Sequence, residues 1–523
     1  MTSWPILRTQ GSYTRRSGEL LFGGSPWGLA RLSVPARSWA RHVLRAGAGP
    51  VAPRDEVERA TARLLVDRGL ALPVLPPRTP RREEIEVVVP VYGSAGSLAR
   101  LLAALDGSSP DGGSPDGDAG RGTGAPRVTV VDDGSAGPEA REIARVCADH
   151  GARLVVLPEN LGPGGARNAG LAATTAGLVA FLDADTLPSP DWLDLLVPHF
   201  TDPVVAAVAP RVRGAVSGPG IGSLLERFEA RRGGLDLGSH ARRVAPGGQI
   251  GYVPTAAMVV RRSALPDPPF EPGLRVGEDV DLVWRLVEAG WTVRYLPAVE
   301  VHHEVRSGLT AWALRHAAYG SSAVPLERRH PGRLAPATLG WPFLSLLSGA
   351  LLMSGGGTWP RALGTAAAVV GIAVQGGTQV RRFRDRGLPV SAGVEIALLG
   401  LRSEATAIGN ALRREWWPLG AAALVLSCAP VPRVRKAARA VVVLGLLPTV
   451  PDTVRAARHH WQCWRAPGAG APEHDAGIPL DPVRHLALRL GADAAYGTGV
   501  ILTALRSRSL AVMRPRLRRL PRG

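Results

Sequence analysis

The sequence predicts an α/β fold built on a mostly parallel sheet, and three observations support that prediction. From residue 85, short apolar runs alternate with helical segments, which is the pattern of successive βαβ units. Residues 178–182 form an apolar run that leads directly into Asp183 and Asp185, as expected of a strand buried on both faces. After residue 333 the chain becomes apolar and rich in small residues. We therefore expect a sheet domain followed by a helical region.

Composition narrows the classes of function. Lys and Arg number 62 against 44 Asp and Glu, a net charge of +18, which suits an anionic partner or membrane surface. A general preference for Arg explains the charge equally well. The basic residues are scattered and lack interleaved aromatics, so nucleic acid is not an expected partner. Cys147, Cys428 and Cys463 have no metal-ligand or disulfide spacing, and no secretory signal precedes them, which fits a cytosolic compartment.

The first 80 residues are expected to form a small separate unit with its linker. A short strand at residues 20–24 precedes helical patterns at 36–44 and 56–68, and Gly69 is placed to end the second helix. Residues 73–80 are rich in proline and suit a linker. This order resembles the small winged-helix, PqqD-like modules that hold precursor peptides during ribosomal peptide maturation. A precursor peptide or maturation proteins are therefore candidate partners, and a structural cap is the other interpretation.

Strands are expected in the next part of the chain, each followed by polar residues. The predicted strands are 86–90, 128–131, 154–157, 178–182, 204–209, 256–260, 292–296 and 299–301. Residues 97–105 and 278–289 are expected to be helical, and the polar tract 106–126 is interpreted as a disordered insertion. Ligands bind beyond the carboxyl ends of parallel strands. We therefore expect one site formed by Pro90–Gly93, Asp132–Ser135, Gly162–Asn168 and Asp183–Asp185.

The two carboxylates after the fourth strand suit a divalent cation. Asp183 and Asp185, one residue apart, offer hard oxygen ligands to Mg²⁺ or Mn²⁺, which usually complete their shell with substrate phosphates. A nucleotide diphosphate is the expected ligand. The pattern by itself is weak, and a polar turn before the helix that residues 188–191 begin explains it as well.

Six motifs in order resemble an inverting family 2 glycosyltransferase with a GT-A fold, a Rossmann-like nucleotide-diphospho-sugar transferase domain. They are PVYG, VVDDGS, NLGPGGARNAG, FLDAD, GEDVDL and VHH, between residues 85 and 304. The resemblance implies a hexosyltransferase that depends on Mn²⁺ or Mg²⁺ and uses a nucleotide-diphosphate sugar as donor.

The resemblance and side-chain chemistry together assign the donor site. Pro90 and Tyr92 would line the nucleotide pocket, and Asp132 or Asp133 would accept hydrogen bonds from uracil and ribose. An Asx turn closed by Gly134 is the alternative for the two aspartates.

Three further residues complete the predicted donor site. Arg167 would face the diphosphate, near a glycine-rich helix start that allows close backbone approach; a surface arginine on a helix-entry loop is the alternative. Asp183 would bind the ribose side of the nucleotide. Asp185 would bind the metal, which neutralises the leaving diphosphate.

Asp279 is the predicted general base, with Glu278 as the alternate. It would take the proton of the acceptor hydroxyl while that oxygen attacks the anomeric carbon opposite the leaving group, which inverts the configuration. Acidic residues that complement a helix dipole are the structural alternative. His302 or His303 would be a third metal ligand, and a structural histidine is the alternative for each.

Two departures from the family pattern narrow the prediction. Gly93 and Ser94 stand where an acidic residue often follows the first strand, so nucleotide contacts from that loop are open. The QxxRW motif of processive synthases is absent, and residues 315–320 occupy its region. A polymerase with its own export channel is therefore not expected.

The region 331–523 is expected to be helical, apolar and membrane-associated, after a capping unit at 1–80 and a transferase domain at 84–330. Its uncharged runs are 334–360, 362–380, 416–432 and 440–451, and the first two are long enough to span a bilayer. Arg381–Arg384 suit a cytoplasmic flank, and residues 395–414 look amphipathic. The cytoplasmic face of the cell membrane is the expected location. Helices buried under the transferase domain are the alternative.

The N-terminal unit, the apolar tail and the RxxxYGxSA pattern after the two histidines resemble the subgroup of these enzymes that acts in mycofactocin biosynthesis. That resemblance implies glucose transfer from UDP-glucose or a related donor onto the small peptide-derived redox cofactor premycofactocin, giving a short β-linked oligoglucoside. Two other functions stay open. One is a family 2 transferase acting on a polyprenyl-phosphate or cell-wall glycan acceptor, and the other is a degenerate transferase serving as a membrane scaffold.

Overall fold

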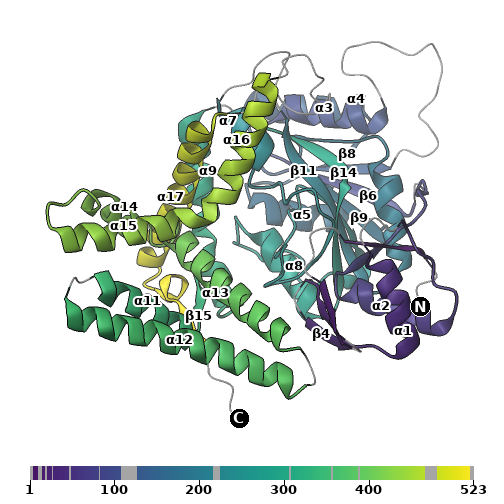
Figure 1. Ribbon diagram of the computed structural model, residues 1–523. Helices are drawn as coiled ribbons and strands as arrows, with labels where there is room; N and C mark the ends of the chain where they lie inside the picture. Colours follow the sequence, from purple (N-terminus) through teal and green to yellow (C-terminus); the bar gives the residue numbers. More distant parts are fainter. Residues whose placement is uncertain are drawn as a thin grey trace. The chain divides into compact units, whose positions relative to one another are not determined.

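The computed structural model describes most of the chain (Figure 1). The described residues are 4–9, 14–17, 20–25, 28–45, 49–81, 83–107, 126–215, 224–305, 308–354, 357–386, 389–465 and 480–518. They divide into two compact units, a sheet unit (Met1–Gly222 with Glu229–Val305) and a helical unit (Ser223–Phe228 with Arg306–Gly523). The insertion predicted at residues 106–126 lies almost wholly outside the described residues.

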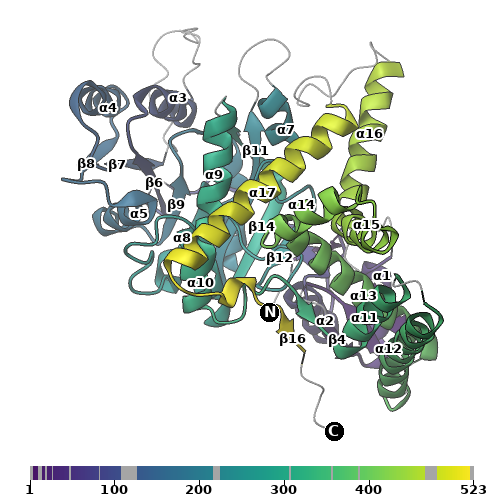
Figure 2. The ribbon, with the colours of Figure 1, turned by 90° about the vertical axis from the view of Figure 1, so that its left-hand side faces the viewer.

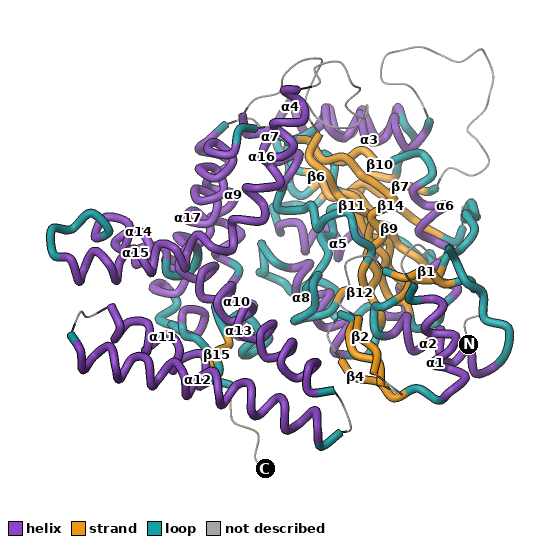
Figure 3. The backbone as a smooth tube through the Cα atoms, viewed as in Figure 1, coloured by secondary structure: helices purple, strands orange, loops and turns teal. Residues whose placement is uncertain are grey.

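The sheet unit is organised around a nine-stranded sheet of order β10-β14-β11-β13-β9-β6-β7-β8, with β12 beside β14 (Figure 3). Its strands are β6 (Ile85–Val91), β7 (Arg127–Asp132), β8 (Arg153–Val156), β9 (Leu178–Leu182), β10 (Thr186–Pro188), β11 (Val205–Ala215), β12 (Arg242–Val244), β13 (Ala257–Arg261) and β14 (Thr292–Glu304). Strands β6 to β9 pair in parallel, β11 pairs in parallel with β14, and β13 is antiparallel to both β9 and β11. Six strands therefore share one direction, and the mostly parallel sheet is confirmed.

Helices cover both faces of the parallel part of this sheet (Figure 2). Helices α3 (Ala95–Asp106) and α4 (Gly137–Asp149) lie on one face, and α5 (Gly162–Ala173) lies on the other. The side chains of Val87 and Val89 belong to the core that α3 joins. On the opposite face, Gly170 of α5 approaches Val88 so closely that a Cβ there would be 2.3 Å from Val88 Cγ1. Burial of both faces explains why these strands are continuous apolar runs.

One strand prediction is wrong in detail. The predicted strands 292–296 and 299–301 are parts of one long strand, β14, whose pairing with β11 shifts register between Leu296 and Glu300. Pro297 lies at that irregularity, where it has no N–H to donate to a ladder. The proline therefore coincides with a bulge inside one continuous strand, whereas the sequence pattern indicated an interruption between two separate strands. The short strands β10 and β12 were not predicted, because three residues carry too little periodicity to detect.

The N-terminal segment folds as a small sheet with two helices. Strands β2 (Thr14–Ser17), β3 (Leu20–Gly23) and β4 (Gly28–Arg31) are antiparallel, and β1 (Ile6–Arg8) pairs with β5 (Ala71–Pro73). The two helices are α1 (Val34–Val43) and α2 (Glu56–Asp67), close to their predicted bounds. Asp55 caps α2 by accepting a hydrogen bond from the Glu58 N–H at 2.8 Å.

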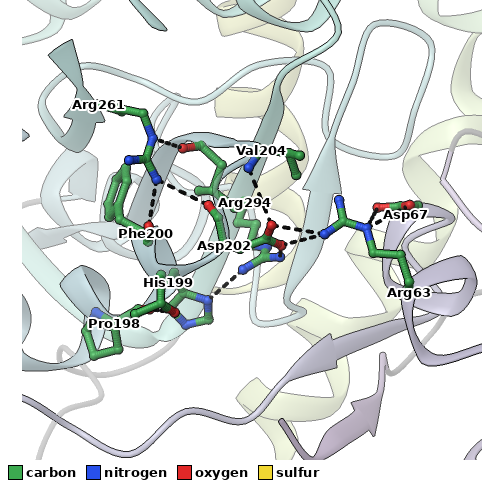
Figure 4. A network of polar contacts seen from close by, with 11 residues as sticks. Arg63, Asp67, Pro198, His199, Phe200, Asp202, Val204, Arg261 and Arg294 are labelled. Atoms are coloured by element: carbon green, nitrogen blue, oxygen red, sulfur yellow. Dashed lines mark hydrogen bonds and ion pairs between the residues drawn. The ribbon is translucent and has the colours of Figure 1, made fainter. Parts of the chain in front are cut away.

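A buried network of salt bridges connects α2 to the central sheet (Figure 4). Arg63 of α2 donates to both carboxylate oxygens of Asp202, at 2.9 and 3.0 Å, and Arg294 of β14 donates to Asp202 at 2.7 Å. Burial opposes ionisation of Asp202, but the charges of Arg294 and Arg63 outweigh it and lower its pKa. Burial and the charge of Arg294 lower the pKa of His199 to about 3, so its neutral Nδ1 accepts from Arg294 at 3.2 Å. The N-terminal segment is therefore part of the sheet unit.

The helical unit contains most of the remaining helices. They are α9 (Leu309–Ser321), α10 (Ala323–Arg329), α11 (Trp341–Ser354), α12 (Thr358–Arg384), α13 (Val390–Arg413), α14 (Trp417–Leu426), α15 (Pro432–Leu446), α16 (Val450–Arg465) and α17 (Pro482–Arg506). The RxxxYGxSA pattern lies in α9 and the start of α10. Gly320 of α9 packs against α17 so tightly that a Cβ there would be 1.9 Å from the Tyr496 carbonyl oxygen. The glycine in this pattern thus has a packing role.

Two helical segments, 358–384 and 432–458, are long and apolar enough to cross a membrane by length and composition. Only 17% of the apolar window in each is buried, so neither resembles the core helix of a soluble protein. The run 334–360 was predicted to be long enough to span a bilayer. In the structure it is divided among β15 (Thr338–Leu339), α11 and the start of α12, because β15 pairs with β16 (Arg516–Leu517) and a break separates the helices.

Candidate functional site

The segments after β6, β7 and β9 meet at the carboxyl ends of the parallel strands. The Asp133 N–H donates to the Val91 carbonyl at 2.9 Å, and the Gly93 N–H donates to Ser135 Oγ at 2.9 Å. The start of α5 joins them through Asp133, and α8 (Glu278–Glu288) joins through Arg167. The structure therefore brings the four predicted segments and the Glu-Asp pair to one edge of the sheet, as the parallel topology requires.

Both aspartates after β7 are buried and accept backbone hydrogen bonds. Asp132 accepts from the Ser135 N–H at 3.0 Å, which is the Asx-type turn considered above. Asp133 accepts from the N–H groups of Leu161 and Gly162, at 2.7 and 2.9 Å. Burial raises the pKa of Asp133, although these two hydrogen bonds act against the shift. Asp133 therefore fixes the start of α5 beside the end of β7.

Pro90 and Tyr92 lie at the end of β6 and just beyond it. Pro90 is half-buried and opposite Val131 of β7, and the Tyr92 side chain is exposed. An exposed aromatic ring beside a cluster of buried carboxylates has a face free to stack on a planar group. The geometry is compatible with the predicted nucleotide contacts.

Arg167 links two other parts of the site. Its guanidinium donates to Asp183 Oδ1 at 2.6 Å and to Glu278 Oε1 at 2.7 Å. The residue is 2% exposed, so the alternative of a surface arginine is wrong. Helix α5 directs Arg167 inward, where charge-assisted hydrogen bonds to two carboxylates hold its guanidinium. Arg167 Nε is also buried and has no hydrogen-bond acceptor within the described part of the chain.

The Glu-Asp pair opens α8, and its two members have different surroundings. Glu278 is buried and bound to Arg167, whereas Asp279 is half-buried and accepts only a hydrogen bond from the Val280 N–H, at 2.8 Å, among the contacts described for it. Burial, followed by the charge of Glu278, raises the pKa of Asp279 to about 7. The charge of Arg167 acts in the opposite direction. Asp279 can therefore exchange a proton near neutral pH.

Asp185 and His303 lie together at the end of β14. His303 Nε2 is 3.4 Å from Asp185 Oδ2, and β10 pairs with β14 so that Thr186 is opposite His303. Side chains alternate along a strand, which directs His302 to the other face. Of the two predicted histidines, His303 is the one that the structure brings to Asp185.

The donor set at Asp185 fits a cation that takes few protein ligands. In the described ranges, no three His, Cys, Asp or Glu side chains gather closely enough to hold a metal by themselves. Mg²⁺ and Mn²⁺ are commonly held by one or two carboxylates, with substrate phosphates and water completing the shell. A carboxylate beside an imidazole matches that pattern, whereas a closed structural site would need more ligands.

Three residues that shape the site were assigned no individual role from the sequence. The Asn168 side chain donates to the Phe270 carbonyl at 2.8 Å and accepts from the Phe270 N–H at 3.0 Å, which fixes the loop before α8. Arg275 of the same loop donates to the Asn160 carbonyl at 2.7 Å. Glu304 accepts from Ser97 at 2.9 Å and holds the end of β14 against α3. Asn168 lies within the predicted site segment Gly162–Asn168, whereas no pattern in the sequence pointed to the contacts of Arg275 or Glu304.

Comparison with known proteins identifies relatives of this chain. Residues 86–267 match the model of Glycosyl transferase family 2, and residues 178–376 match Glycosyl transferase family group 2. The chain is 36% identical over 509 residues to a Pre-mycofactocin glycosyltransferase of Mycobacterium tuberculosis, covering 96% of this chain and 95% of that protein. It is 32% identical over 125 residues to the Succinoglycan biosynthesis protein ExoO of Rhizobium meliloti, covering 23% and 31%.

Solved structures include a mannosyltransferase, PcManGT from Pyrobaculum calidifontis in complex with GDP-Man and Mn²⁺. It is 17% identical, covers 72% of this chain and 90% of its own, and superposes with a TM-score of 0.34.

Proposed function

This chain belongs to glycosyl transferase family 2, and we propose that it transfers glucose from a nucleotide-diphosphate sugar onto premycofactocin, building a short β-linked oligoglucoside. The observation that carries the proposal is the 36% identity to a Pre-mycofactocin glycosyltransferase, which extends over 96% of this chain. Similarity of that extent includes the N-terminal and helical segments as well as the sheet, whereas the match to ExoO covers only 23% of the chain. The resemblance is thus to a whole protein with this organisation.

Asp279 acts as the general base in this proposal. Its pKa of about 7 lets the carboxylate accept a proton at neutral pH. The acceptor hydroxyl oxygen forms a bond to the anomeric carbon, the bond from that carbon to the diphosphate oxygen breaks, and the hydroxyl proton passes to Asp279. Glu278 is less suited to this role because Arg167 holds its carboxylate at 2.7 Å. Inversion of the anomeric configuration follows from attack opposite the leaving group.

The donor binds at the carboxyl end of the sheet. Asp132 or Asp133, together with Asp183, accepts hydrogen bonds from the nucleoside, Tyr92 and Pro90 border the base, and Arg167 faces the diphosphate. Asp185 and His303 would hold Mn²⁺ or Mg²⁺. When bound, such a cation neutralises charge on the leaving diphosphate.

Membrane association at the cytoplasmic face is a further part of the proposal. Only 17% of the apolar window in each of the segments 358–384 and 432–458 is buried, which suits a lipid environment. The N-terminal segment would serve as a PqqD-like unit for a precursor peptide or a maturation partner. A polyprenyl-phosphate or cell-wall acceptor is the second candidate, because the same exposed apolar helices would suit a lipid-linked substrate.

The test is transfer by the purified protein with Mn²⁺ and UDP-glucose, with and without premycofactocin, followed by mass spectrometry. We expect hexose increments on premycofactocin that are absent in Asp185→Ala and Asp279→Asn. If the transferred hexose is recovered only in a lipid extract, the acceptor is the lipid-linked candidate and not premycofactocin. If Asp279→Asn still supports the biological role in cells, the scaffold function would be correct and the enzymatic proposal wrong.

A further inference from the structure

Exposed apolar side chains gather at the ends of two helical hairpins in the helical unit. Helices α11 and α12 form one hairpin and α14 and α15 form the other. The exposed residues near the connecting ends are Leu352, Met353, Trp359 and Leu363 in the first and Leu424, Val425, Leu426 and Val431 in the second. Trp359 is 79% exposed and Val425 is 75% exposed. Exposing so many large apolar side chains to water is unfavourable, which indicates that a partner covers this surface.

The two hairpins lie side by side and end in the same direction. Helices α11 and α15 are in contact. The connecting ends project to the same side in Figure 1 and face the viewer together in Figure 2. One flat apolar surface could therefore receive both ends at once.

Charge identifies the partner as anionic lipid. The four helices contain no Asp or Glu, and α15 begins with Arg433, Arg435 and Lys436. Arg435 and Arg439 donate to the carbonyls of Ala429 and Ser427, so they hold the turn between α14 and α15. Basic residues beside apolar tips favour insertion among anionic headgroups. A lipid surface offers both features that these tips require, apolar chains and an anionic headgroup layer above them.

The length of the second hairpin limits its depth in a membrane. Helix α14 has 10 residues, which corresponds to about 15 Å, whereas the hydrocarbon core is about 30 Å thick. Charged side chains lie below this hairpin, where Arg413 binds Asp493 at 2.9 Å. Deeper insertion would bring that ion pair into hydrocarbon, at a high cost. The hairpin can therefore enter one leaflet but cannot cross to the other.

We propose that both hairpins insert into a single leaflet of an anionic phospholipid bilayer and that the chain does not cross the membrane. The inference rests on the membrane association proposed above and adds its geometry. Helix α12 is long enough to span a bilayer. It lies in the same unit as the short hairpin of α14 and α15, however, so the depth to which that hairpin can insert also limits the depth of α12. The attachment is then monotopic, with Arg433 and Lys436 at the level of the lipid phosphates.

Vesicle binding tests the surface. The full chain is mixed with vesicles of phosphatidylcholine and phosphatidylglycerol, and Val425→Gln is compared with Val483→Gln, since both valines are 75% exposed and lie on helices of this unit. We expect Val425→Gln to weaken binding roughly tenfold and Val483→Gln to leave it unchanged. Lys436→Gln should weaken binding to these vesicles but not to pure phosphatidylcholine. Equal effects of the two valine variants would contradict the proposal.

The same experiment separates lipid from a second copy of the chain. If the protein ignores vesicles but forms a dimer that Val425→Gln dissociates, the hairpins are a self-association surface and the lipid proposal is wrong. Loss of vesicle binding in every condition would also remove the membrane association on which this inference rests.

Cys428 reports whether the hairpin crosses. It is exposed between α14 and α15, and Cys147 is buried, so a Cys463→Ser protein carries one polarity-sensitive fluorophore at Cys428. We expect a blue shift on vesicle binding and quenching by nitroxides placed shallowly in the outer leaflet. Quenching by a water-soluble reagent trapped inside the vesicles would show that the tip has crossed. That result would overturn the one-leaflet inference while leaving membrane association intact.

Discussion

At the scale of single residues, the site depends on how three charges balance around Asp279. Arg167 bridges Asp183 and Glu278, and all of these groups act on Asp279. Burial is the largest of the causes that raise the pKa of Asp279, followed by the charge of Glu278. The charge of Asp183 also raises this pKa, whereas the charge of Arg167 lowers it. The buried arginine is therefore suited to positioning two carboxylates and to keeping the base ionisable at neutral pH.

Removing the two neighbouring charges should move the pH profile in opposite directions. In Arg167→Gln the acid limb of kcat/KM should shift to higher pH by about one unit, because an attractive charge is lost. In Glu278→Gln it should shift to lower pH, because a repulsive charge is lost. Initial rates of nucleotide release over pH 5 to 9 measure both. Shifts of the same sign would show that the variants act by disturbing the fold rather than through the charge at Asp279.

Asp279→Asn should lose most transfer activity, by about 10²- to 10⁴-fold, since a general base is removed. It should also change the pH dependence of stability. A carboxyl whose pKa is higher in the folded chain, about 7, than in the unfolded chain, about 3.9, makes the free energy of unfolding fall as pH rises between these values. Urea unfolding at pH 5 and pH 8 should show a larger decrease in the wild type than in Asp279→Asn. An equal decrease would place the pKa of Asp279 near its ordinary value.

At the scale of elements, glycine sets the distance between α9 and α17. A Cβ at Gly499 would be 1.9 Å from the Ala317 carbonyl oxygen, and Gly320 meets α17 as closely from the other side. Backbone atoms cannot move aside as a flexible side chain can. The two helices therefore pack at a separation that only glycine allows.

Gly499→Ala should destabilise the chain by about 1–3 kcal/mol, because the steric cost exceeds the helix propensity that alanine gains. Gly376→Ala is the matched control, since Gly376 lies within α12 and a Cβ there has no atom within 4 Å. It should be neutral or slightly stabilising. Thermal unfolding of both variants measures the difference. A similar Tm for the two would show that α9 and α17 can separate without loss.

Sequence patterns located most elements of the sheet, and the exceptions have physical causes. The apolar runs of β6, β7 and β9 identify strands buried on both faces, and each is followed by polar residues at the ligand edge. The sequence pattern predicted that β13 belongs to the sheet, but it did not predict that β13 is antiparallel to its neighbours. The direction of a strand depends on the path of the chain between strands, which periodicity does not reveal. The predicted apolar runs 334–360 and 362–380 divide the chain at Arg361, whereas α11 ends at Ser354 and α12 begins at Thr358, since hydropathy does not locate the end of a helix within an apolar run.

At the scale of the whole molecule, the N-terminal segment is joined to the sheet by a charge that has no access to water. Asp202 is 1% exposed and binds Arg63 of α2 and Arg294 of β14. A buried carboxylate between two arginines is costly to remove, because Arg294, which is 1% exposed, would be left charged and without a carboxylate, while Arg63 would keep only Asp67. The N-terminal segment and the central sheet should therefore unfold together.

Asp202→Asn should lower the free energy of unfolding by about 3–5 kcal/mol. Glu142→Gln is the matched change of a carboxylate to an amide, in an exposed pair with Arg145, and should leave the stability almost unchanged. Guanidinium unfolding followed by circular dichroism measures both. A small effect of Asp202→Asn, comparable to that of Glu142→Gln, would mean that Arg63 and Arg294 are solvated by water and that the network is not a structural link.

The sequence by itself determined the class of fold, the edge of the sheet at which the site lies, and the residue types gathered there. Those features depend on short-range patterns, namely apolar periodicity and the residues that end each strand. Only the tertiary structure decided that Arg167 is held by Glu278, that His303 rather than His302 reaches Asp185, and that Arg63 reaches Asp202. Each of these pairings joins residues more than 100 positions apart, and they form only when the sheet brings distant segments of the chain together.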